Sequence, residues 1–297
     1  MSIADTITRR PLRERRKRLP KGKPMTFAVG MLSFGGLIVA ADTQLTRPDG
    51  TTDYASKVKA GLTGNGSYVL AYSAEETNAA DSLLDRIADE LTIRDFTSLS
   101  EFKDRMRDAM KDWASQYTVP GDQPFIMLIA GAFVKEIGAN PKDIGLFLCG
   151  PPGAVVQKTQ ENSSGYVCSG AGGIISDPLF KVLFARPASS QVRLAQIAYL
   201  MYRVKKDCAG ACGGETDAVF LPFEHSKPLW IHPRSFKQAE DRGWIIDEAL
   251  AAAAGAAIPE ATYDGRKSLQ TILDDIQRLK AGPQDIDFQV LGGGTIR

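Results

Sequence analysis

The sequence predicts an α+β fold, a four-layer αββα sandwich in which two antiparallel sheets pack face to face and carry helices on their outer sides. The order of the elements supports this prediction, because strand-like and helical segments come in blocks: strands, two helices, strands, two helices and a strand. The composition supports it as well. The 297 residues are 43% hydrophobic and 24% charged, as expected for a globular protein with a sizeable core.

Four predicted strands form the first block. The apolar runs Thr26–Ser33 and Leu37–Thr43 flank a Gly-Gly pair, which is typical of a hairpin. Lys57–Leu62 and Ser67–Ser73 follow, and the turn between them is rich in Gly and Asn, which tolerate positive φ. All four strands precede the first predicted helix.

Two amphipathic helices form the second block. Ser73 with Glu76, and Ser98 with Glu101, have the spacing of a capping box at the start of a helix. Apolar residues at helical spacing follow each pair, which predicts two helices lying on a sheet. The apolar stripes are Ala80, Leu83, Leu84, Ile87, Ala88 and Leu91 in the first helix, and Phe102, Met106, Ala109, Met110 and Trp113 in the second.

Strands and helices alternate again in the second half of the chain. Strand character returns at Phe125–Val134 and Ile144–Cys149. Helical patterns cover Asp177–Phe184 and Gln191–Lys206, and an apolar run at Asp217–Leu221 predicts one more strand. This half therefore supplies the remaining strands and the second pair of helices.

These patterns also predict the domain organisation. Residues 26–234 are expected to form one αββα domain, and residues 235–297 a C-terminal extension packed on the same domain, since no low-complexity linker separates them. Helical patterns at Glu248–Ala257 and Lys267–Lys280 and an apolar strand at Asp287–Leu291 lie in the extension.

Residues 1–25 differ in composition from the rest. They hold nine Lys or Arg residues against two acidic ones, a charge of +7, whereas the remaining chain carries −6. Such a charge-rich segment without core residues is predicted to be a disordered leader that is removed or not translated. Because it is short and has no aromatic residue for base stacking, we expect no nucleic-acid partner.

Several protein classes are excluded. No apolar run is long enough for a membrane helix, and the N-terminus lacks the apolar centre of a secretory signal, so we expect a cytoplasmic protein without membrane contact. The chain has neither a Gly-x4-Gly-Lys-Ser/Thr phosphate loop nor a nucleophile elbow. Any ATPase motor that the protein requires is therefore another chain.

The cysteines predict neither a disulfide framework nor a metal site. Cys208 and Cys212 are close enough in sequence to bind a metal, but His225 and His232 are the chain's only histidines and no second cysteine pair completes a set of four ligands. Buried thiols are the favoured reading. We expect no cofactor and no metal.

Thr26 is the candidate nucleophile. A threonine hydroxyl needs a base, and a free α-amine on the same residue serves as one because its pKa is about 8. Thr26 directly follows Met25, so removal of that methionine from a chain that starts there exposes the amine. A neighbouring cation held by a carboxylate keeps the amine partly unprotonated, and Lys57 and Asp42 are the candidates.

The order of these residues resembles the proteasome β-subunit family of N-terminal nucleophile hydrolases. Residues 35–43, Gly-Gly-Leu-Ile-Val-Ala-Ala-Asp-Thr, look like the family's glycine-led strand, Lys57-Val58 looks like its Lys-Ile/Val pair, and Ser169-Gly170 like its Ser-Gly step. Together with Thr26, the resemblance covers residues 26 to about 221. The resemblance implies the N-terminal nucleophile hydrolase fold.

The resemblance also implies a role for each residue. Thr26 Oγ attacks, its amine is the base, and Lys57 and Asp42 tune that amine. Ser169 supports the amine by hydrogen bonding. These roles make up the predicted catalytic centre.

Two further features are implied only approximately. The family's supporting Asp-x-x-Ser-Gly segment is altered here to Asp207 followed by a run of small residues and cysteines. The family's oxyanion donor, a backbone N–H at a glycine, corresponds to Ala71 or Tyr72. A backbone donor is preserved despite the change of side chain.

The resemblance implies a threonine endopeptidase that assembles into a homo-oligomeric ring, cleaves unfolded polypeptide and works with a separate ATPase unfoldase. Two alternatives remain open. One is a non-catalytic ring subunit whose leader blocks the Thr26 amine, and the other is an amidase of the same fold that acts on a small amide.

Overall fold

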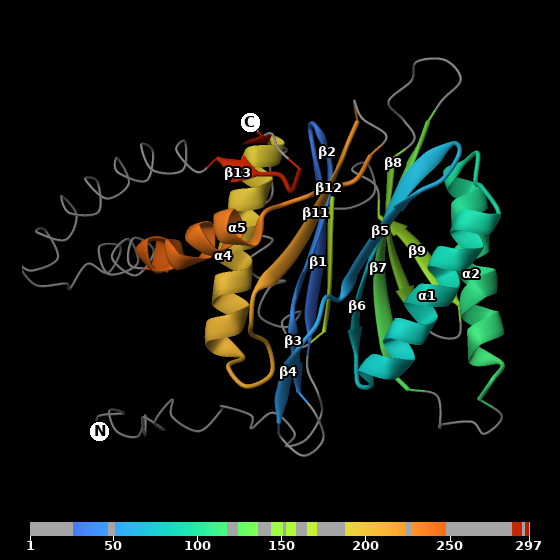
Figure 1. Cartoon of the computed structure of the whole chain (residues 1–297), viewed down its shortest axis with the longest axis horizontal. Helices are drawn as coiled ribbons and strands as arrows, with labels where there is room; N and C mark the ends of the chain where they lie inside the picture. Colours follow the sequence, from blue (N-terminus) through green and yellow to red (C-terminus); the bar gives the residue numbers. More distant parts are fainter. Residues whose placement is uncertain are drawn as a thin grey trace, which may run out of the picture.

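Two five-stranded antiparallel sheets form the centre of the computed structural model, which describes residues 26–46, 51–117, 124–135, 144–150, 153–158, 165–170, 188–223, 227–247, 287–292 and 295–296 (Figure 1). The first sheet has the strand order β10-β1-β2-β11-β12 and the second β5-β6-β7-β8-β9. The first-sheet strands are β10 (Tyr166–Gly170), β1 (Phe27–Ser33), β2 (Gly36–Asp42), β11 (Thr216–Pro222) and β12 (Leu229–Trp230). The second-sheet strands are β5 (Val58–Leu62), β6 (Gly66–Ala74), β7 (Ile126–Val134), β8 (Ile144–Gly150) and β9 (Ala154–Lys158).

An apolar layer, here called the inner core, lies between the two sheets. β1 and β2 are buried along their whole length and pair in antiparallel register, with Ala28 opposite Ala41. Strands buried on both faces are continuous apolar runs, which explains why β1 and β2 show no polar alternation. The inner core consists of Ala28, Leu32, Leu37, Val39, Ala41, Val58, Val69, Ala71, Ile129, Leu146, Val167, Val219 and Leu221.

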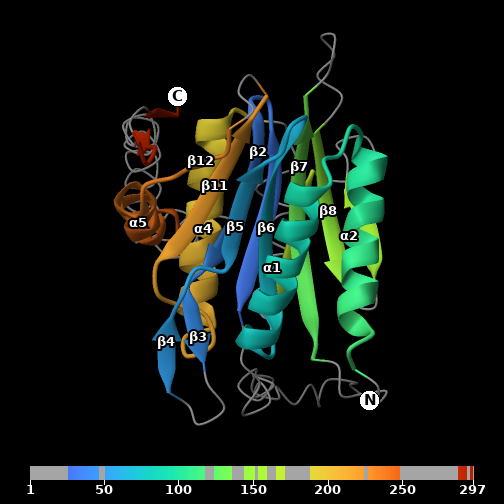
Figure 2. The ribbon, with the colours of Figure 1, turned by 45° about the vertical axis from the view of Figure 1, so that its right-hand side comes forward.

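Helices α1 (Thr77–Ile93) and α2 (Leu99–Ala114) cover the outer face of the second sheet (Figure 2). The Ser98 hydroxyl caps α2 by accepting a hydrogen bond from the Glu101 N–H at 3.1 Å, and Glu101 accepts one from the Thr97 N–H in return. The helix start and the Ser98 cap predicted for α2 are therefore confirmed, although Glu101 bonds to Thr97 and not to the N–H of Ser98 itself. One stripe of each helix is buried against the sheet, as the periodicity predicted.

Helices α4 (Ser190–Asp207) and α5 (Pro233–Asp241) lie on the outer face of the first sheet. α5 begins with a proline in its first turn, and His232 caps it through its Nδ1 atom. The hairpin of β13 (Phe288–Gln289) and β14 (Thr295–Ile296) packs on the same core, where the Phe288 and Phe236 rings lie 6.1 Å apart. Within the described residues, no helix is sufficiently long and apolar to cross a membrane.

The architecture corrects the four-layer αββα sandwich predicted from the sequence. Strands hold more of the described residues than helices do, and they form four antiparallel sheets. The hairpin β13–β14 and the pair β3 (Gln44–Thr46) and β4 (Thr52–Tyr54) stand apart from the two central sheets. The four described helices cover the outer faces unevenly, since α1 and α2 are both long whereas α5 has only 9 residues. Regular strand and helix periodicity predicts the long elements but not the short pairs that surround them.

Individual elements differ from the prediction as well. The capping box predicted at Ser73 is wrong: Ser73 lies within β6, and α1 starts at Thr77 with Glu76 as an N-cap that makes no side-chain hydrogen bond. The short elements β3, β4, β9, β12 and α5 have no counterpart among the predicted ones. The helices expected at 177–184, 248–257 and 267–280 lie outside the described residues.

Candidate active site

Thr26 lies directly before β1 with only 4% of its surface exposed. Side chains alternate along a strand, and Ala28 points into the inner core, so the Thr26 side chain is on the same face. Its Oγ1 atom accepts a hydrogen bond from the backbone N–H of Ala74 at 3.2 Å. Ala74 is the last residue of β6, so the hydroxyl lies where the two sheets meet.

Asp42 and Lys57 form a fully buried ion pair. The Lys57 Nζ atom is 2.9 Å from Asp42 Oδ1, and both side chains are 0% exposed. Asp42 ends β2 of the first sheet, while Lys57 immediately precedes β5 of the second, so the pair links the sheets. Lys57 also donates to the backbone carbonyl of Gln44. The structure thus brings together the two charges that the sequence predicted as partners.

Two backbone N–H groups complete the surroundings of Asp42. Phe27 N–H donates to Oδ1 at 2.8 Å, and Gly213 N–H donates to Oδ2 at 3.1 Å. With the Lys57 ammonium this makes three hydrogen-bond donors to one carboxylate. Because Phe27 follows Thr26 in the chain, Asp42 also fixes the backbone next to the candidate nucleophile.

The electrostatic state of Lys57 is set by burial. Removal from water lowers the pKa of its ammonium group, and the charge and hydrogen bond of Asp42 oppose this effect. The positive charge of Lys205 lowers the pKa further. A lysine with a lowered pKa exchanges its proton more readily than one in water, which suits a group placed beside an acid–base centre.

Ser169 and Gly170 lie alongside Thr26, at the end of β10. Ser169 pairs with Ala28 and Gly170 with Phe27 across the β1–β10 ladder. Gly170 has φ +90°, and a Cβ atom there would be 1.8 Å from the Thr26 carbonyl oxygen, so only glycine fits this close approach. Ser169 is 6% exposed, and its hydroxyl has no hydrogen-bond partner among the residues that the structure describes.

The predicted oxyanion donors do not contact Thr26. The Tyr72 N–H donates to the Lys57 carbonyl at 3.3 Å, and Ala71 lies inside the ladder, paired with Val58 and Ile129. β6 extends past the start of β5, which leaves the Ala74 N–H available to meet Thr26. The backbone donor near the candidate nucleophile is therefore Ala74, two or three residues beyond the predicted positions.

Asp207 is not part of this cluster. It is the last residue of α4, and its carboxylate pairs with Arg203 at 3.0 Å on the surface. The segment after it reaches the site instead, because Gly213 bonds to Asp42 and its carbonyl accepts from the Gln44 N–H at 3.2 Å. The run of small residues from 209 to 214 was the sequence signal for such a close approach.

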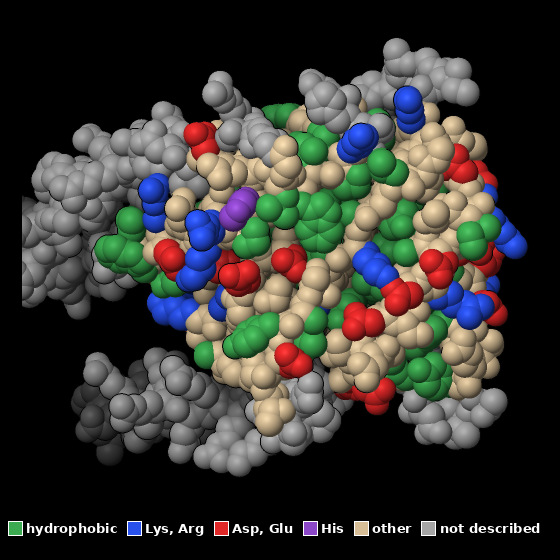
Figure 3. All heavy atoms as spheres, viewed as in Figure 1, with side chains coloured by type: hydrophobic (Ala, Val, Ile, Leu, Met, Phe, Trp, Pro, Cys, Tyr) green, Lys and Arg blue, Asp and Glu red, His purple; other side chains and the backbone are tan. Residues whose placement is uncertain are grey.

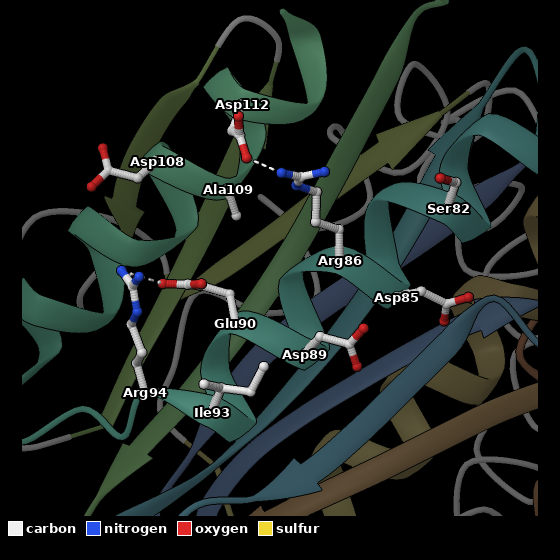
Figure 4. A pocket seen from close by; sticks show the side chains of 10 residues that line it. All are labelled: Ser82, Asp85, Arg86, Asp89, Glu90, Ile93, Arg94, Asp108, Ala109 and Asp112. Atoms are coloured by element: carbon white, nitrogen blue, oxygen red, sulfur yellow. Dashed lines mark hydrogen bonds and ion pairs between the residues drawn. The ribbon is translucent and has the colours of Figure 1, made fainter. Parts of the chain in front are cut away.

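A surface pocket of about 600 Å³ lies between α1 and α2, away from these residues (Figure 4). Acidic side chains dominate its lining, and the two arginines are paired, Arg86 with Asp112 and Arg94 with Glu90. Exposed ion pairs of this kind contribute little to stability. The pocket contains none of the candidate catalytic residues.

Metal binding has no visible basis in the described part of the chain, where no three His, Cys, Asp or Glu side chains come together. All four cysteines are thiols: Cys149, Cys208 and Cys212 are buried and Cys168 is half-buried. The Cys208 and Cys212 thiols hydrogen-bond to each other. The described groups around Thr26 are its hydroxyl, the buried Asp42–Lys57 pair and backbone N–H donors.

Comparison with known proteins shows a shared fold. No family model and no curated protein match the sequence. Among solved structures, Anbu (ancestral beta-subunit) from Yersinia bercovieri matches with a TM-score of 0.65 and 16% identity over 80% of this chain and 100% of that one. Anbu from Hyphomicrobium sp. strain MC1 matches with a TM-score of 0.62 and 18% identity over 79% of this chain and 99% of that one. The helical assembly of the Anbu complex from Pseudomonas aeruginosa matches with a TM-score of 0.61 and 14% identity over 80% of this chain and 100% of that one.

These comparisons correct the assignment to the proteasome β-subunit family. The short motifs at 35–43, Lys57-Val58 and Ser169-Gly170 carried that assignment, but no family model or curated protein supports it. The solved structures described above are Anbu proteins, which are a distinct family. At such low identity the likeness concerns the fold. In this structure residues 35–43 extend from the turn before β2 through β2 itself to Thr43, Lys57-Val58 lies at the start of β5, and Ser169-Gly170 ends β10.

Proposed function

We propose that this chain is an N-terminal nucleophile hydrolase that cleaves peptide bonds with Thr26 as the nucleophile. The observation that carries the proposal is the fully buried Asp42–Lys57 pair, whose carboxylate also holds the backbone at Phe27. A buried ion pair is costly to desolvate and is a weak source of stability, so its position next to a buried threonine favours a chemical role.

The reaction follows from the residues around Thr26. Its free amine removes the hydroxyl proton and Oγ attacks the peptide carbonyl. The Thr26 ammonium then gives that proton to the leaving nitrogen, the C–N bond breaks, and an ester to Thr26 remains. The proposed oxyanion donor is the Ala74 N–H, and its support is its closeness to the nucleophile, since it donates to Oγ1 at 3.2 Å. Asp42 and Lys57 tune the amine electrostatically, and Ser169 orients it.

The amine is available only in a chain that starts at Thr26. While Met25 precedes it, the nitrogen belongs to a peptide bond and is no base. We therefore include the removal of residues 1–25 in the proposal, with 26–234 as the catalytic domain and 235–297 as an extension of it. The full-length chain is expected to be inactive.

We further propose that the protein acts as a homo-oligomer on unfolded polypeptide, with a separate ATPase as unfoldase. The fold it shares with a protein known as a helical assembly of the Anbu complex supports the oligomer. Light scattering of the purified chain tests this point: a mass of several subunits supports it, and a monomer contradicts it.

The proposed activity is tested on protein prepared to begin at Thr26, with an unfolded, fluorescently labelled polypeptide as substrate. Three proteins are compared: the chain starting at Thr26, the Thr26→Ala variant, and the chain that retains Met25. Release of peptides by the first protein alone supports the proposal. Equal hydrolysis by the Thr26→Ala variant would refute the role of Thr26.

One observation favours a second candidate, a non-catalytic assembly subunit. Lys57 donates hydrogen bonds to Asp42 and to the Gln44 carbonyl, whereas the hydrogen bond to the Thr26 hydroxyl comes from the Ala74 N–H. The ion pair therefore also has a structural role, because it links the two sheets. A non-catalytic subunit keeps its leader, and intact-mass analysis of the protein from its native host distinguishes the two functions. A chain starting at Thr26 supports catalysis.

A further inference from the structure

Three hydroxyl side chains face the inner core at the end where Thr26 lies. Ala71 of β6 points into this core, so side-chain alternation places Ser73 on the same face. Ser169 of β10 pairs with Ala28, whose side chain is in the inner core. Ser169 therefore faces the inner core from the first sheet, whereas Ser73 faces it from the second. At this end of the inner core, three hydroxyl groups thus form a polar spot next to the candidate nucleophile.

Close contacts at Gly170 show that these groups converge. A Cβ atom placed at Gly170 would lie 3.0 Å from the Ser73 Cβ atom and 1.8 Å from the Thr26 carbonyl oxygen. The residue after Ser73 is Ala74, whose N–H contacts Thr26 Oγ1 at 3.2 Å. Ser73 therefore lies against Thr26 and the Ser169–Gly170 step, although it belongs to the other sheet.

The Ser73 and Ser169 hydroxyls are both buried and both lack a hydrogen-bond partner among the described residues. Ser73 is 3% exposed and Ser169 is 6% exposed. A buried hydroxyl without a partner costs stability, so its retention calls for an explanation. Two of them beside one nucleophile indicate a small polar ligand that bonds to both.

We propose that Ser73 is a positioning residue for the hydrolytic water, which it holds together with Ser169. This inference rests on the proposed function, because only an acyl-enzyme on Thr26 requires such a water. Water fits the chemistry of the spot, since a buried water makes two to four hydrogen bonds to otherwise unpaired polar groups. A hydroxyl on each side lets the water keep one proton directed to the Thr26 amine.

The step that Ser73 assists is the second half of the reaction. The water oxygen attacks the ester carbonyl on Thr26 while the Thr26 amine takes the water proton. The C–Oγ bond then breaks, and Oγ recovers that proton from the amine as the carboxylic acid leaves. One ester and one water thus give one acid and the free threonine hydroxyl, and no other reactant is needed.

A matched control lies on the same strand. Ser67 is fully buried, lacks a hydrogen-bond partner among the described residues, and is on the same face of β6 as Ser73. The two residues are six positions apart, roughly 20 Å along the strand. Ser67→Ala therefore removes an equally buried hydroxyl without touching the site. Neither substitution should lower the melting temperature by much, because neither hydroxyl bonds to another described protein group.

The test measures the two half-reactions separately, with a peptide p-nitrophenyl ester and protein that begins at Thr26. The time course of nitrophenolate release has two phases. The initial burst measures acylation of Thr26, and the rate of the linear phase that follows measures deacylation. For Ser73→Ala we expect a full burst, one equivalent per site, and a linear phase slowed about tenfold, as expected for the loss of one hydrogen bond. Ser67→Ala should behave like the unchanged protein.

Hydroxylamine provides a second readout. It attacks the ester without needing a positioned water, so it should restore the turnover of Ser73→Ala. The proposal is overturned if Ser73→Ala turns over at the unchanged rate, if burst and linear phase fall in the same proportion, or if Ser67→Ala gives the same defect. A protein beginning at Thr26 that releases no nitrophenolate at all overturns the proposed function, and the role of Ser73 with it.

Discussion

Asp42 is the residue on which the candidate site depends most. It accepts hydrogen bonds from Lys57, Phe27 and Gly213, which lie in three separate segments of the chain. Each donor comes from a different turn or strand end, so one carboxylate fixes the relative positions of all three. The sequence identified Asp42 and Lys57 because both stand at the ends of apolar strands. It did not identify Gly213 or Ala74, whose contribution is a backbone N–H that any residue type carries.

Asp42→Asn leaves the Lys57 ammonium buried without a negative partner. We expect this substitution to lower the free energy of unfolding by about 3–5 kcal/mol, the usual cost of breaking a buried ion pair. Urea denaturation measures the change, and Asp207→Asn is the control, because Asp207 pairs with Arg203 on the surface and should change stability by about 1 kcal/mol or less. Equal effects of the two substitutions would contradict a buried, charged Asp42.

Cys149 gives the protein a pH dependence above neutrality. Its complete burial raises the pKa of the thiol to about 12, whereas an unfolded cysteine titrates at about 8.5. The folded pKa is the higher one, so the stabilisation is fully present below pH 8.5 and is lost as the pH rises from there towards 12. Unfolding free energies at pH 8 and pH 10 should differ by about 2 kcal/mol more in the native protein than in Cys149→Ala. An identical pH dependence of both proteins would show that the thiol titrates normally.

At the scale of elements, α4 and α5 are joined by a second buried ion pair. Lys205 Nζ lies 2.9 Å from both carboxylate oxygens of Glu240 and 2.7 Å from the Thr216 hydroxyl. Thr216 pairs with Asp42 in the β11–β2 ladder. The Lys205–Glu240 pair, which holds α5 on the sheet, therefore lies next to the candidate site. This pair explains how a helix of 9 residues stays ordered on the sheet.

Glu240→Gln leaves Lys205 without its partner and should lower the free energy of unfolding by about 3 kcal/mol. The double variant Lys205→Met with Glu240→Leu replaces the pair by apolar side chains of similar size and should cost less than the single change. Chemical denaturation of the three proteins measures this difference. A double variant that is no more stable than Glu240→Gln would contradict the expected cost of leaving Lys205 without its partner.

The elements also show what the sequence could and could not predict. Long buried strands such as β1 and β6 and the amphipathic helices α1 and α2 follow directly from apolar periodicity. The capping box predicted at Ser73 is wrong. Ser73-x-x-Glu76 has the spacing of a capping box, but β6 pairs with β7 as far as Ala74, so Ser73 is a strand residue. Short elements such as β3 and α5 depend on contacts with residues distant in the sequence, and apolar periodicity contains no information about such contacts.

At the scale of the whole molecule, two large sheets and their helices enclose three apolar cores. Charged groups of both signs are interspersed with hydrophobic side chains on the face seen in Figure 3. The apolar core between the first sheet and helices α4 and α5 also includes residues near the end of the chain, among them Phe288. The C-terminal hairpin is thus packed into the same body as the site.

Phe288→Ala tests how far this hairpin stabilises the molecule. The side chain is fully buried against Phe236, so its truncation should lower the free energy of unfolding by about 3–5 kcal/mol. Leu291→Ala is the control, because Leu291 is 52% exposed and should change stability by about 0.5 kcal/mol or less. Thermal denaturation compares them, and an unchanged Phe288→Ala would mean that the hairpin is not docked in solution.

The central claim, that Thr26 is both nucleophile and base once it is the first residue, is tested most directly by locating the acyl group. Protein beginning at Thr26 is treated with the peptide p-nitrophenyl ester, quenched in acid, digested and analysed by tandem mass spectrometry, beside a chain that retains Met25. We predict an acyl group on Thr26 of the first protein and none on the second. An acyl group on another residue, or equal labelling of Thr26 in both chains, would contradict the account.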